Sequence, residues 1–289
     1  MYQYVVGGLG NQLFQFSMLH FVLLSSQETK GTIWLDKTPR LDRPFLLEPL
    51  VSDCVHIDRV TTPYAGARGF AARVLRKLSS GKFHCSKIIS ERREGREFTF
   101  TPSLKGIASR QDFWIGYFQH FRFVEAVWHQ VGAEISNLLE SIEINLKLPE
   151  KFCLIHVRRG DFLKYGNSFG VLSQEYFINA RSSLDPAKEL FLIVVTDDPD
   201  SAKSICAALG PNLVLGPNEL DEWQTIKLMS MASAIVTSNS TFSWWGSRVA
   251  LDTGCKVAIP EPWFVDLELG VQDAFAHPEF RLIQSVFEN

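Results

Sequence analysis

The densest group of reactive residue types in this 289-residue chain directly follows a short apolar run. The run FCLI leads into His156, after which Arg158, Arg159, Gly160 and Asp161 follow within five positions. A short apolar run of this kind predicts a buried strand. Because a guanidinium forms bidentate, charge-assisted bonds to phosphate, an arginine fixed at the end of a strand favours a bound phosphate group. Asp161 either orients that guanidinium or accepts a proton.

Two adjacent arginines in extended chain point in opposite directions, so we expect one of Arg158 and Arg159 to face the crevice at the end of the strand and the other to face away. His156 stands two positions before Arg158 and therefore lies on the same face of the extended segment. The ordinary alternative is a pair of solvated arginines beside a half-buried histidine.

A second motif, VVTDDPD, places Asp197 and Asp198 at the end of the most hydrophobic predicted strand. Two carboxylates alone are a weak sign of a metal site, because no third oxygen ligand stands near them. Asp198 precedes Pro199 and is a good helix cap with proline at the first helical position. Asp197 is then left to accept two hydrogen bonds from a guanine edge.

A third motif, TSNSTFSWWGS, is rich in hydroxyl groups where a predicted strand passes into a helix. The helix N-terminus at Ser240 and Thr241 is a ready anion site. The alternative is a simple Ser/Thr cap followed by an aromatic core stripe. On either view, Trp244 and Trp245 are expected to serve packing.

The turn GGLGNQ near the start follows a predicted strand and opens a predicted helix. It is either a phosphate-binding turn or a tight turn in which Asn11 caps the helix. The dinucleotide fingerprint would need a third glycine at position 13, where the chain has Leu13, so a nicotinamide site is poorly supported. The aromatic loop GYFQH, residues 116–120, either contacts a sugar ring or packs in the core.

Apolar runs alternate with helical patterns along the whole second half of the chain. Five strands are predicted, with helices between them, over 152–157, 189–199, 212–216, 234–240 and 256–260. This order predicts a doubly wound parallel sheet, which binds ligands at the carboxyl ends of its strands. The first half also begins as strand, glycine turn, helix and strand, and a basic helix is expected over 68–78. A charged loop leading to a strand is expected over 90–100.

Composition and length limit the classes of function. The chain is 46% apolar, 21% charged and carries a net charge of -3, so no overall field attracts nucleic acid or an anionic membrane. Its five scattered cysteines include no CxxC pair, which favours reduced thiols over a disulfide framework or zinc site. The N-terminus does not resemble a signal peptide and no run reaches the ~20 apolar residues of a membrane span, so a cytoplasmic location is expected. The length favours two domains, with a linker near residues 148–151.

The four motifs GGLGNQLFQF, HVRRGDF, VVTDDP and SNSTFSWWGS, in this order, resemble those of the α1,2-fucosyltransferases of glycosyltransferase family 11. The resemblance runs from Gly7 to about Ala250. It implies an α/β protein of the GT-B fold, in which two Rossmann-like domains face each other across a cleft. Residues 1–149 would form the acceptor-side domain and residues 150–289 the GDP-fucose-binding domain. Residues 60–100 match none of these motifs and are expected to help form the acceptor site.

The resemblance also implies a reaction. L-Fucose would pass from GDP-β-L-fucose to the 2-hydroxyl group of a terminal galactose in a glycan, with inversion and with no metal or cofactor. Arg158 would bind the diphosphate and Asp161 would be the nearest candidate base. The other implied roles belong to His156 beside the nucleotide, Asp197 on guanine, Ser240 and Thr241 on phosphate, and Asn11 near phosphate or fucose.

Three alternatives stay open at the level of sequence. One is a GDP-fucose transferase with another acceptor or linkage. Another is a non-catalytic protein that binds a GDP-sugar or a glycan. The third, a dinucleotide oxidoreductase, lacks the glycine at position 13.

Overall fold

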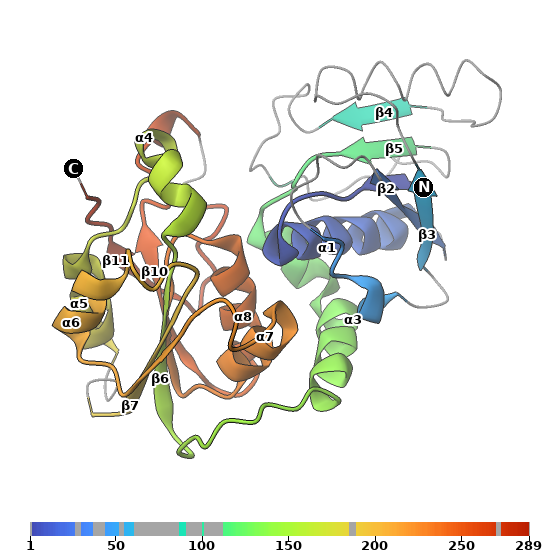
Figure 1. The fold of residues 1–289 in the computed structure, drawn as a ribbon. Coiled ribbons are helices and arrows are strands. Elements are labelled where there is room, and N and C mark those ends of the chain that lie inside the picture. The colour runs from blue at the N-terminus through green and yellow to red at the C-terminus, as the bar shows by residue number, and fades with distance from the viewer. Residues whose placement is uncertain are drawn as a thin grey trace. The chain divides into compact units, whose positions relative to one another are not determined.

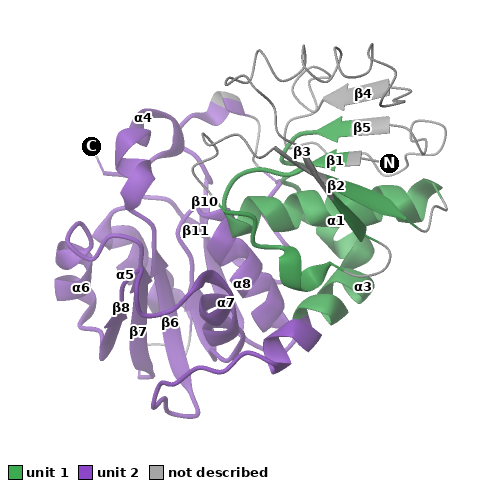
Figure 2. Cartoon of the chain, turned by 45° about the vertical axis from the view of Figure 1, so that its right-hand side comes forward, with its two compact units in different colours: residues 1–135 green, residues 136–289 purple. Residues whose placement is uncertain are grey.

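The structure is a computed structural model in which two compact units are distinguished. It describes residues 2–26, 30–36, 44–51, 55–60, 87–90, 100, 112–184, 189–269 and 273–288. The units comprise residues 1–135 and 136–289 (Figure 2). The division falls within a long helix, whereas the sequence predicts a boundary at 149/150. The helix expected over 68–78 and nearly all of the loop expected over 90–100 lie outside the described residues.

Unit 1 is built on a parallel sheet whose strand order is β3-β2-β1-β5-β4. Its strands are β1 (Tyr2–Tyr4), β2 (Gly31–Asp36), β3 (Val55–Val60), β4 (Lys87–Ser90) and β5 (Asp112–Ile115). The expected start, strand, glycine turn, helix and strand, is confirmed, whereas β3, β4 and β5 were not anticipated. The strand order reverses between β1 and β5, so the loops that follow these two strands lie next to each other.

Among the described residues of unit 1, the helices are α1 (Leu9–Ser26), the short η1 (Glu48–Leu50) and α3 (Phe121–Glu140), which continues into unit 2 (Figure 1). α1 is buried at nearly every position from Leu9 to Leu23, which explains why its sequence is apolar on all sides. Polar groups in such a helix must find partners inside the protein.

Unit 2 contains a six-stranded sheet in the order β11-β10-β9-β6-β7-β8, with every pair parallel. Its strands are β6 (Phe152–Val157), β7 (Phe191–Thr196), β8 (Leu213–Leu215), β9 (Ala234–Val236), β10 (Lys256–Glu261) and β11 (Arg281–Gln284). The five expected strands are confirmed, but β10 is not the last. β11 lies at the sheet edge with mostly exposed side chains, and only two of its four residues are apolar, which is too short a run to predict a strand.

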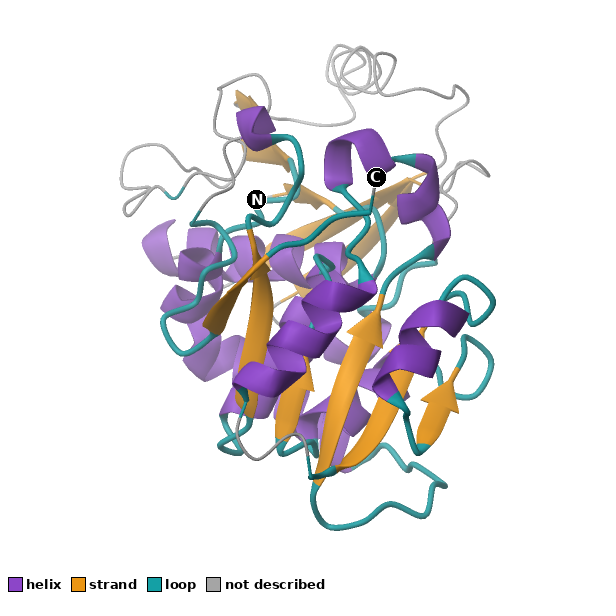
Figure 3. Cartoon of the chain, turned by 90° about the vertical axis from the view of Figure 1, so that its left-hand side faces the viewer, coloured by secondary structure: helices purple, strands orange, loops and turns teal. Residues whose placement is uncertain are grey.

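Helices cover both faces of the unit 2 sheet (Figures 1 and 3). They are α5 (Gln174–Ser183), α6 (Lys203–Leu209), α7 (Glu222–Ser230) and α8 (Thr241–Leu251), with short turns at η2 (Gly160–Lys164), α4 (Gly166–Phe169) and η3 (Leu267–Leu269). α5 and α6 lie on one face, and α7 and α8 on the other. Gly210 ends α6 in the left-handed conformation, which glycine adopts most readily.

Each unit is therefore an open parallel sheet with a reversal of strand order. Two Rossmann-like α/β domains in one chain constitute the GT-B class, and the predicted fold class is confirmed. Within the described residues, we find no helix with the length and apolar character of a membrane span.

Candidate functional site

Three of the sequence motifs meet at the carboxyl edge of the unit 2 sheet. β6 pairs with β7 so that Val157 lies opposite Thr196, and with β9 so that Ile155 lies opposite Val236. The residues that follow these three strands are therefore neighbours in space. The strand order reverses between β6 and β9, and such a switch point is where doubly wound sheets bind their ligands.

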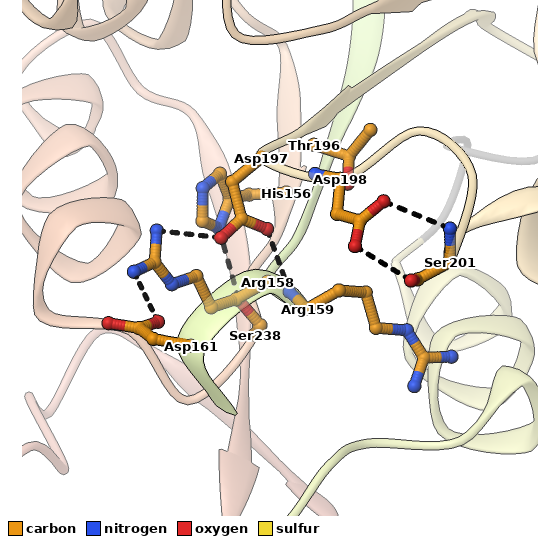
Figure 4. A network of polar contacts seen from close by, with 9 residues as sticks. All are labelled: His156, Arg158, Arg159, Asp161, Thr196, Asp197, Asp198, Ser201 and Ser238. Carbon is orange, nitrogen blue, oxygen red and sulfur yellow. Dashed lines mark hydrogen bonds and ion pairs between the residues drawn. The ribbon is translucent and has the colours of Figure 1, made fainter. Parts of the chain in front are cut away.

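Arg158, directly after β6, is held by two carboxylates (Figure 4). Its Nη2 lies 2.5 Å from Asp161 Oδ1, and its Nη1 lies 2.9 Å from Asp197 Oδ2. The guanidinium carbon lies 5.7 Å from the centre of the Phe162 ring. The arginine side chain is 19% exposed. A positive charge is thus fixed at the switch point, as the motif predicts, and both of its acidic neighbours come from motifs.

Asp197 is bound by the end of β6 on both of its oxygens. Besides the contact with Arg158, its Oδ1 accepts a hydrogen bond of 2.8 Å from the backbone N–H of Arg159. A Cβ atom at position 160 would collide with Asp197 Oδ2, so Gly160 is needed for this close approach. Whether Asp197 reads guanine stays a prediction. What the structure adds is that this carboxylate connects the ends of β6 and β7.

Asp198 does not cap α6, which corrects the expectation from the sequence. α6 begins only at Lys203, and Asp198 instead closes the turn before it. Its oxygens accept from the backbone N–H of Ser201 at 3.1 Å and from the Ser201 hydroxyl at 2.7 Å. These hydrogen bonds, the hydroxyl first, lower the pKa of the Asp198 carboxyl.

His156 is fully buried rather than half-buried, and it spans the switch point. Its Nδ1 lies 3.0 Å from the Ser238 hydroxyl, which follows β9, and its ring lies beside Phe242 at 5.7 Å. Burial, and secondly the charge of Arg158, lower its pKa to about 3. The imidazole is therefore neutral near pH 7. It forms one hydrogen bond with Ser238, on the far side of the switch point.

The third motif forms the turn from β9 into α8. Ser240 is the N-cap residue by position, but its side chain makes no capping hydrogen bond. Thr241 opens the helix, and the helix dipole gives this end partial positive charge. Trp244 and Trp245 are buried, as expected, and the Trp244 indole N–H donates to the Phe275 carbonyl at 2.9 Å.

Two neighbours in this motif were not singled out from the sequence. Ser238 binds His156, and the Asn239 amide donates to the carbonyls of Phe169 and Gly170 at 2.8 and 3.2 Å. Asn239 thereby fixes the loop that follows α4. The density of small polar residues in TSNS was the only signal of these roles.

Asn11 belongs to unit 1 and does not cap α1, because the helix begins two residues earlier at Leu9. Its Oδ1 accepts a hydrogen bond of 2.7 Å from Gln119, in the loop after β5. Gly7 has φ +88°, and a Cβ there would lie 2.8 Å from the Asn11 amide nitrogen. The loops after β1 and β5 are thus joined at the switch point of unit 1.

Two buried glutamines of the first motif hold this turn and were missed by the sequence analysis. The Gln12 amide donates to the carbonyls of Gly7 and Pro44, both at 2.7 Å, and accepts from the Leu46 N–H at 2.9 Å. Gln15 accepts from the Val6 N–H at 2.9 Å. Two amides in an otherwise apolar helix were the signal for this role.

The structure therefore brings most of the predicted site residues together. Arg158 contacts both Asp161 and Asp197. His156 contacts Ser238, which lies in the turn that leads into α8. Asn11 lies in the other unit. In the part of the chain that the structure describes, no group of three or more His, Cys, Asp or Glu side chains is arranged to hold a metal ion.

Doubly wound sheets bind ligands at their switch points, but this fold alone does not define the reaction. The family model described as glycosyl transferase family 11 matches residues 76–277, and the chain belongs to this family. It is therefore a glycosyltransferase, which uses a nucleotide-sugar donor and a glycan acceptor.

Two curated relatives, both from Escherichia coli, resemble nearly the whole chain. The O-antigen biosynthesis glycosyltransferase WbnK is 26% identical, with 91% of this chain and 95% of that protein covered. An alpha-1,2-colitosyltransferase is 26% identical, with 93% of this chain and 94% of that protein covered.

Among solved structures, the E. coli heptosyltransferase WaaC with ADP is similar with a TM-score of 0.49 and 12% identity, covering 98% of this chain and 92% of that one. POFUT1 in complex with GDP is similar with a TM-score of 0.41 and 15% identity, and the match covers 89% of this chain and 98% of that one.

Proposed function

We propose that this glycosyltransferase transfers L-fucose from GDP-β-L-fucose to the 2-hydroxyl group of a terminal galactose in a glycan. The transfer inverts the anomeric carbon and needs no metal ion. The observation that carries the proposal is Arg158, held at the switch point of unit 2 by Asp161 and Asp197. The four family motifs support the choice of donor and linkage.

The chemical task of Arg158 follows from the bond that breaks. As fucose leaves GDP, negative charge grows on the diphosphate, and a preorganised cation stabilises it without reorganising. The N-terminus of α8, at Ser240 and Thr241, adds partial positive charge. In the structure the guanidinium already has carboxylate partners. A diphosphate oxygen replaces Asp161, which is 42% exposed, more readily than Asp197, which is 22% exposed.

Asp161 pairs with Arg158 until the donor binds in this proposal and does not act as the base. Its oxygen lies 2.5 Å from the guanidinium, so this carboxylate is already engaged with Arg158. An oxocarbenium-like transition state needs little help from a base at the acceptor hydroxyl. The remaining roles are those that the family motifs suggest, with neutral His156 beside the nucleotide, Asp197 toward guanine and Asn11 near the phosphate or fucose.

A second donor is favoured by one observation, the relative that is an alpha-1,2-colitosyltransferase. Colitose is fucose without the 3-hydroxyl group, so a site for one sugar differs from a site for the other by a single hydrogen-bonding position. The other relative acts in O-antigen biosynthesis. Together they support a polysaccharide acceptor and leave fucose and colitose as the two donors to compare.

The test incubates the purified chain with lactose and with GDP-fucose, GDP-colitose or GDP-mannose in turn, each with EDTA. GDP release and the linkage of the product are measured. Release with GDP-fucose, together with an α1,2 linkage, is the expected result. Preference for GDP-colitose would reassign the donor, and loss of activity with EDTA would contradict metal-free transfer. Donor binding without release, across a panel of galactosides, would favour a non-catalytic protein.

A further inference from the structure

The second arginine of the HVRRGD motif, Arg159, is almost fully buried. Its side chain is 3% exposed, and its Nη2 lies 2.6 Å from Oε1 of Glu288, a residue 129 positions further along the chain. A buried guanidinium needs a partner, because an unpaired charge in the interior is strongly destabilising. The charge of Arg159 also reaches Asp198, but the oxygens of that acid accept from Ser201.

The backbone around Glu288 is fixed independently of this ion pair. Phe287 forms an antiparallel bridge with Leu172. The N–H of Ser173 donates to the Val286 carbonyl at 2.8 Å, and the N–H of Glu288 donates to the Val171 carbonyl at 2.7 Å. The segment 286–288 is therefore bound to the chain that enters α5, and it presents the Glu288 carboxylate to Arg159 from a defined place.

Arg159 is in turn connected to the arginine of the candidate site. Its backbone N–H donates to Asp197 Oδ1 at 2.8 Å, and Asp197 Oδ2 lies 2.9 Å from Arg158 Nη1. A continuous series of polar contacts thus runs from Glu288 through Arg159 and Asp197 to Arg158. The two arginines directly follow β6, Asp197 directly follows β7, and Glu288 lies near the end of the sequence.

We propose that Glu288 is a positioning residue for the donor site. By binding the Arg159 guanidinium it holds the turn after β6 in the conformation that presents the Arg159 N–H to Asp197. Asp197 then sets the direction of the Arg158 guanidinium. Glu288 touches no substrate in this scheme. That the positioned group serves a diphosphate rests on the proposed function, whereas the positioning itself does not.

The competing explanation is that Glu288 only stabilises the fold. The test compares Glu288→Gln, which removes the charge and keeps the shape, with Glu288→Asp, which keeps the charge. Glu279→Gln is the matched control, because Glu279 is an exposed acid in the same part of the chain. For each variant we would measure hydrogen exchange at the Arg159 amide, the dissociation constant for GDP, and KM for donor and acceptor separately.

We expect Glu288→Gln to speed exchange at the Arg159 amide at least tenfold, to weaken GDP binding about tenfold and to raise the donor KM by a similar factor. The acceptor KM should stay unchanged, Glu288→Asp should recover most of the loss, and Glu279→Gln should behave as wild type. A lower melting temperature with unchanged amide exchange and GDP affinity would overturn the proposal. If Glu288→Gln does not fold, Glu288→Met, which also removes the charge and keeps a similar side-chain length, takes its place, and unchanged amide exchange and GDP affinity in that variant would overturn the proposal equally.

The two hypotheses fail in different ways. If the wild-type chain binds no GDP while Glu288→Gln still speeds exchange at the Arg159 amide, the positioning by Glu288 is supported and the proposed donor is contradicted. If the wild-type chain transfers fucose and Glu288→Gln matches it in every measurement, the proposed function stands and the positioning role is overturned.

Discussion

Arg158 lies between two carboxylates that differ in exposure and in what else holds them. Asp161 has the more exposed side chain of the two, and it belongs to the short η2 helix that follows the motif. Asp197 is tied to the backbone of Arg159. The guanidinium is therefore oriented mainly from the Asp197 side, and its other side is available to exchange Asp161 for a ligand.

The first prediction concerns this arginine. Arg158→Ala should lower kcat/KM for the donor by a factor of about 100 to 1000, because a preorganised donor to the developing charge is lost. Arg158→Lys should recover only part of the lost kcat/KM, since an ammonium group lacks the planar fork of a guanidinium. Steady-state kinetics and circular dichroism check this. Lys164→Ala, which removes an exposed cation of η2, is the control. An Arg158→Ala variant with most of its activity would exclude the phosphate role.

The second prediction concerns two buried histidines. Burial lowers the pKa of His156 to about 3 and that of His20 to about 4, from an ordinary value of 6.5. The unfolded chain therefore binds protons below pH 6.5 that the folded chain does not, and stability falls as the pH falls. The free energy of unfolding should drop by ~1.4 kcal/mol per histidine between pH 7.5 and 5.5.

Urea unfolding at a series of pH values measures this slope. His20→Gln should remove about half of the slope, because a glutamine at this position gains no proton on unfolding. Burial raises the pKa of Glu134 and of Glu261, which acts in the opposite direction, but only nearer their ordinary value of 4.5. A flat profile from pH 7.5 to 5.5 would contradict the neutral, buried state of both histidines.

At the scale of elements, the site depends on how closely the turn after β6 approaches the end of β7. Gly160 leaves no room for a side chain, because Asp197 Oδ2 occupies the place of its Cβ. We predict that Gly160→Ala displaces Asp197, lowers donor kcat/KM at least tenfold and destabilises unit 2 by ~1–3 kcal/mol.

Donor kinetics and thermal unfolding test this change, with Gly210→Ala as the comparison for a glycine in a left-handed conformation that meets no neighbour. That control should lose stability, because its φ is strained, and should retain its donor KM. Equal donor KM in the wild type and in Gly160→Ala would show that the contact with Asp197 is not required.

Several elements could be predicted from the sequence because their signal is local. β6, β7 and β9 are short apolar runs, and the motif residues follow them directly. β11 could not, since an exposed edge strand has little apolar content and depends on pairing with β10. The cap assigned to Asp198 failed for a related reason, because a turn can satisfy an aspartate as well as a helix can.

For the site, the sequence identified the residues but not their partners. Parallel pairing explains why Arg158 and Asp197 meet, and both were predicted. Glu288 and Gln119 carry no local signal, because their roles depend on contacts across 129 and 108 positions of chain. Such contacts follow from the topology of the folded sheet and not from residue type or spacing.

At the scale of the whole molecule, both units use the same construction. Each sheet has a reversal of strand order, and in each a hydrogen bond between side chains joins the two strand ends at the reversal. Asn11 binds Gln119 in unit 1, and His156 near the end of β6 binds Ser238 after β9 in unit 2. The family assignment covers residues 76–277 and so includes parts of both units. A transferase needs a donor and an acceptor site, and two such edges in one chain provide two places to build them.

The ion pair between Arg159 and Glu288 also has a consequence in time. It joins positions 129 residues apart, and closing so long a loop is slow compared with forming the local turn at η2. The turn at η2 needs only local contacts, whereas the ion pair that supports Arg159 depends on the pairing of segments that lie far apart in the sequence.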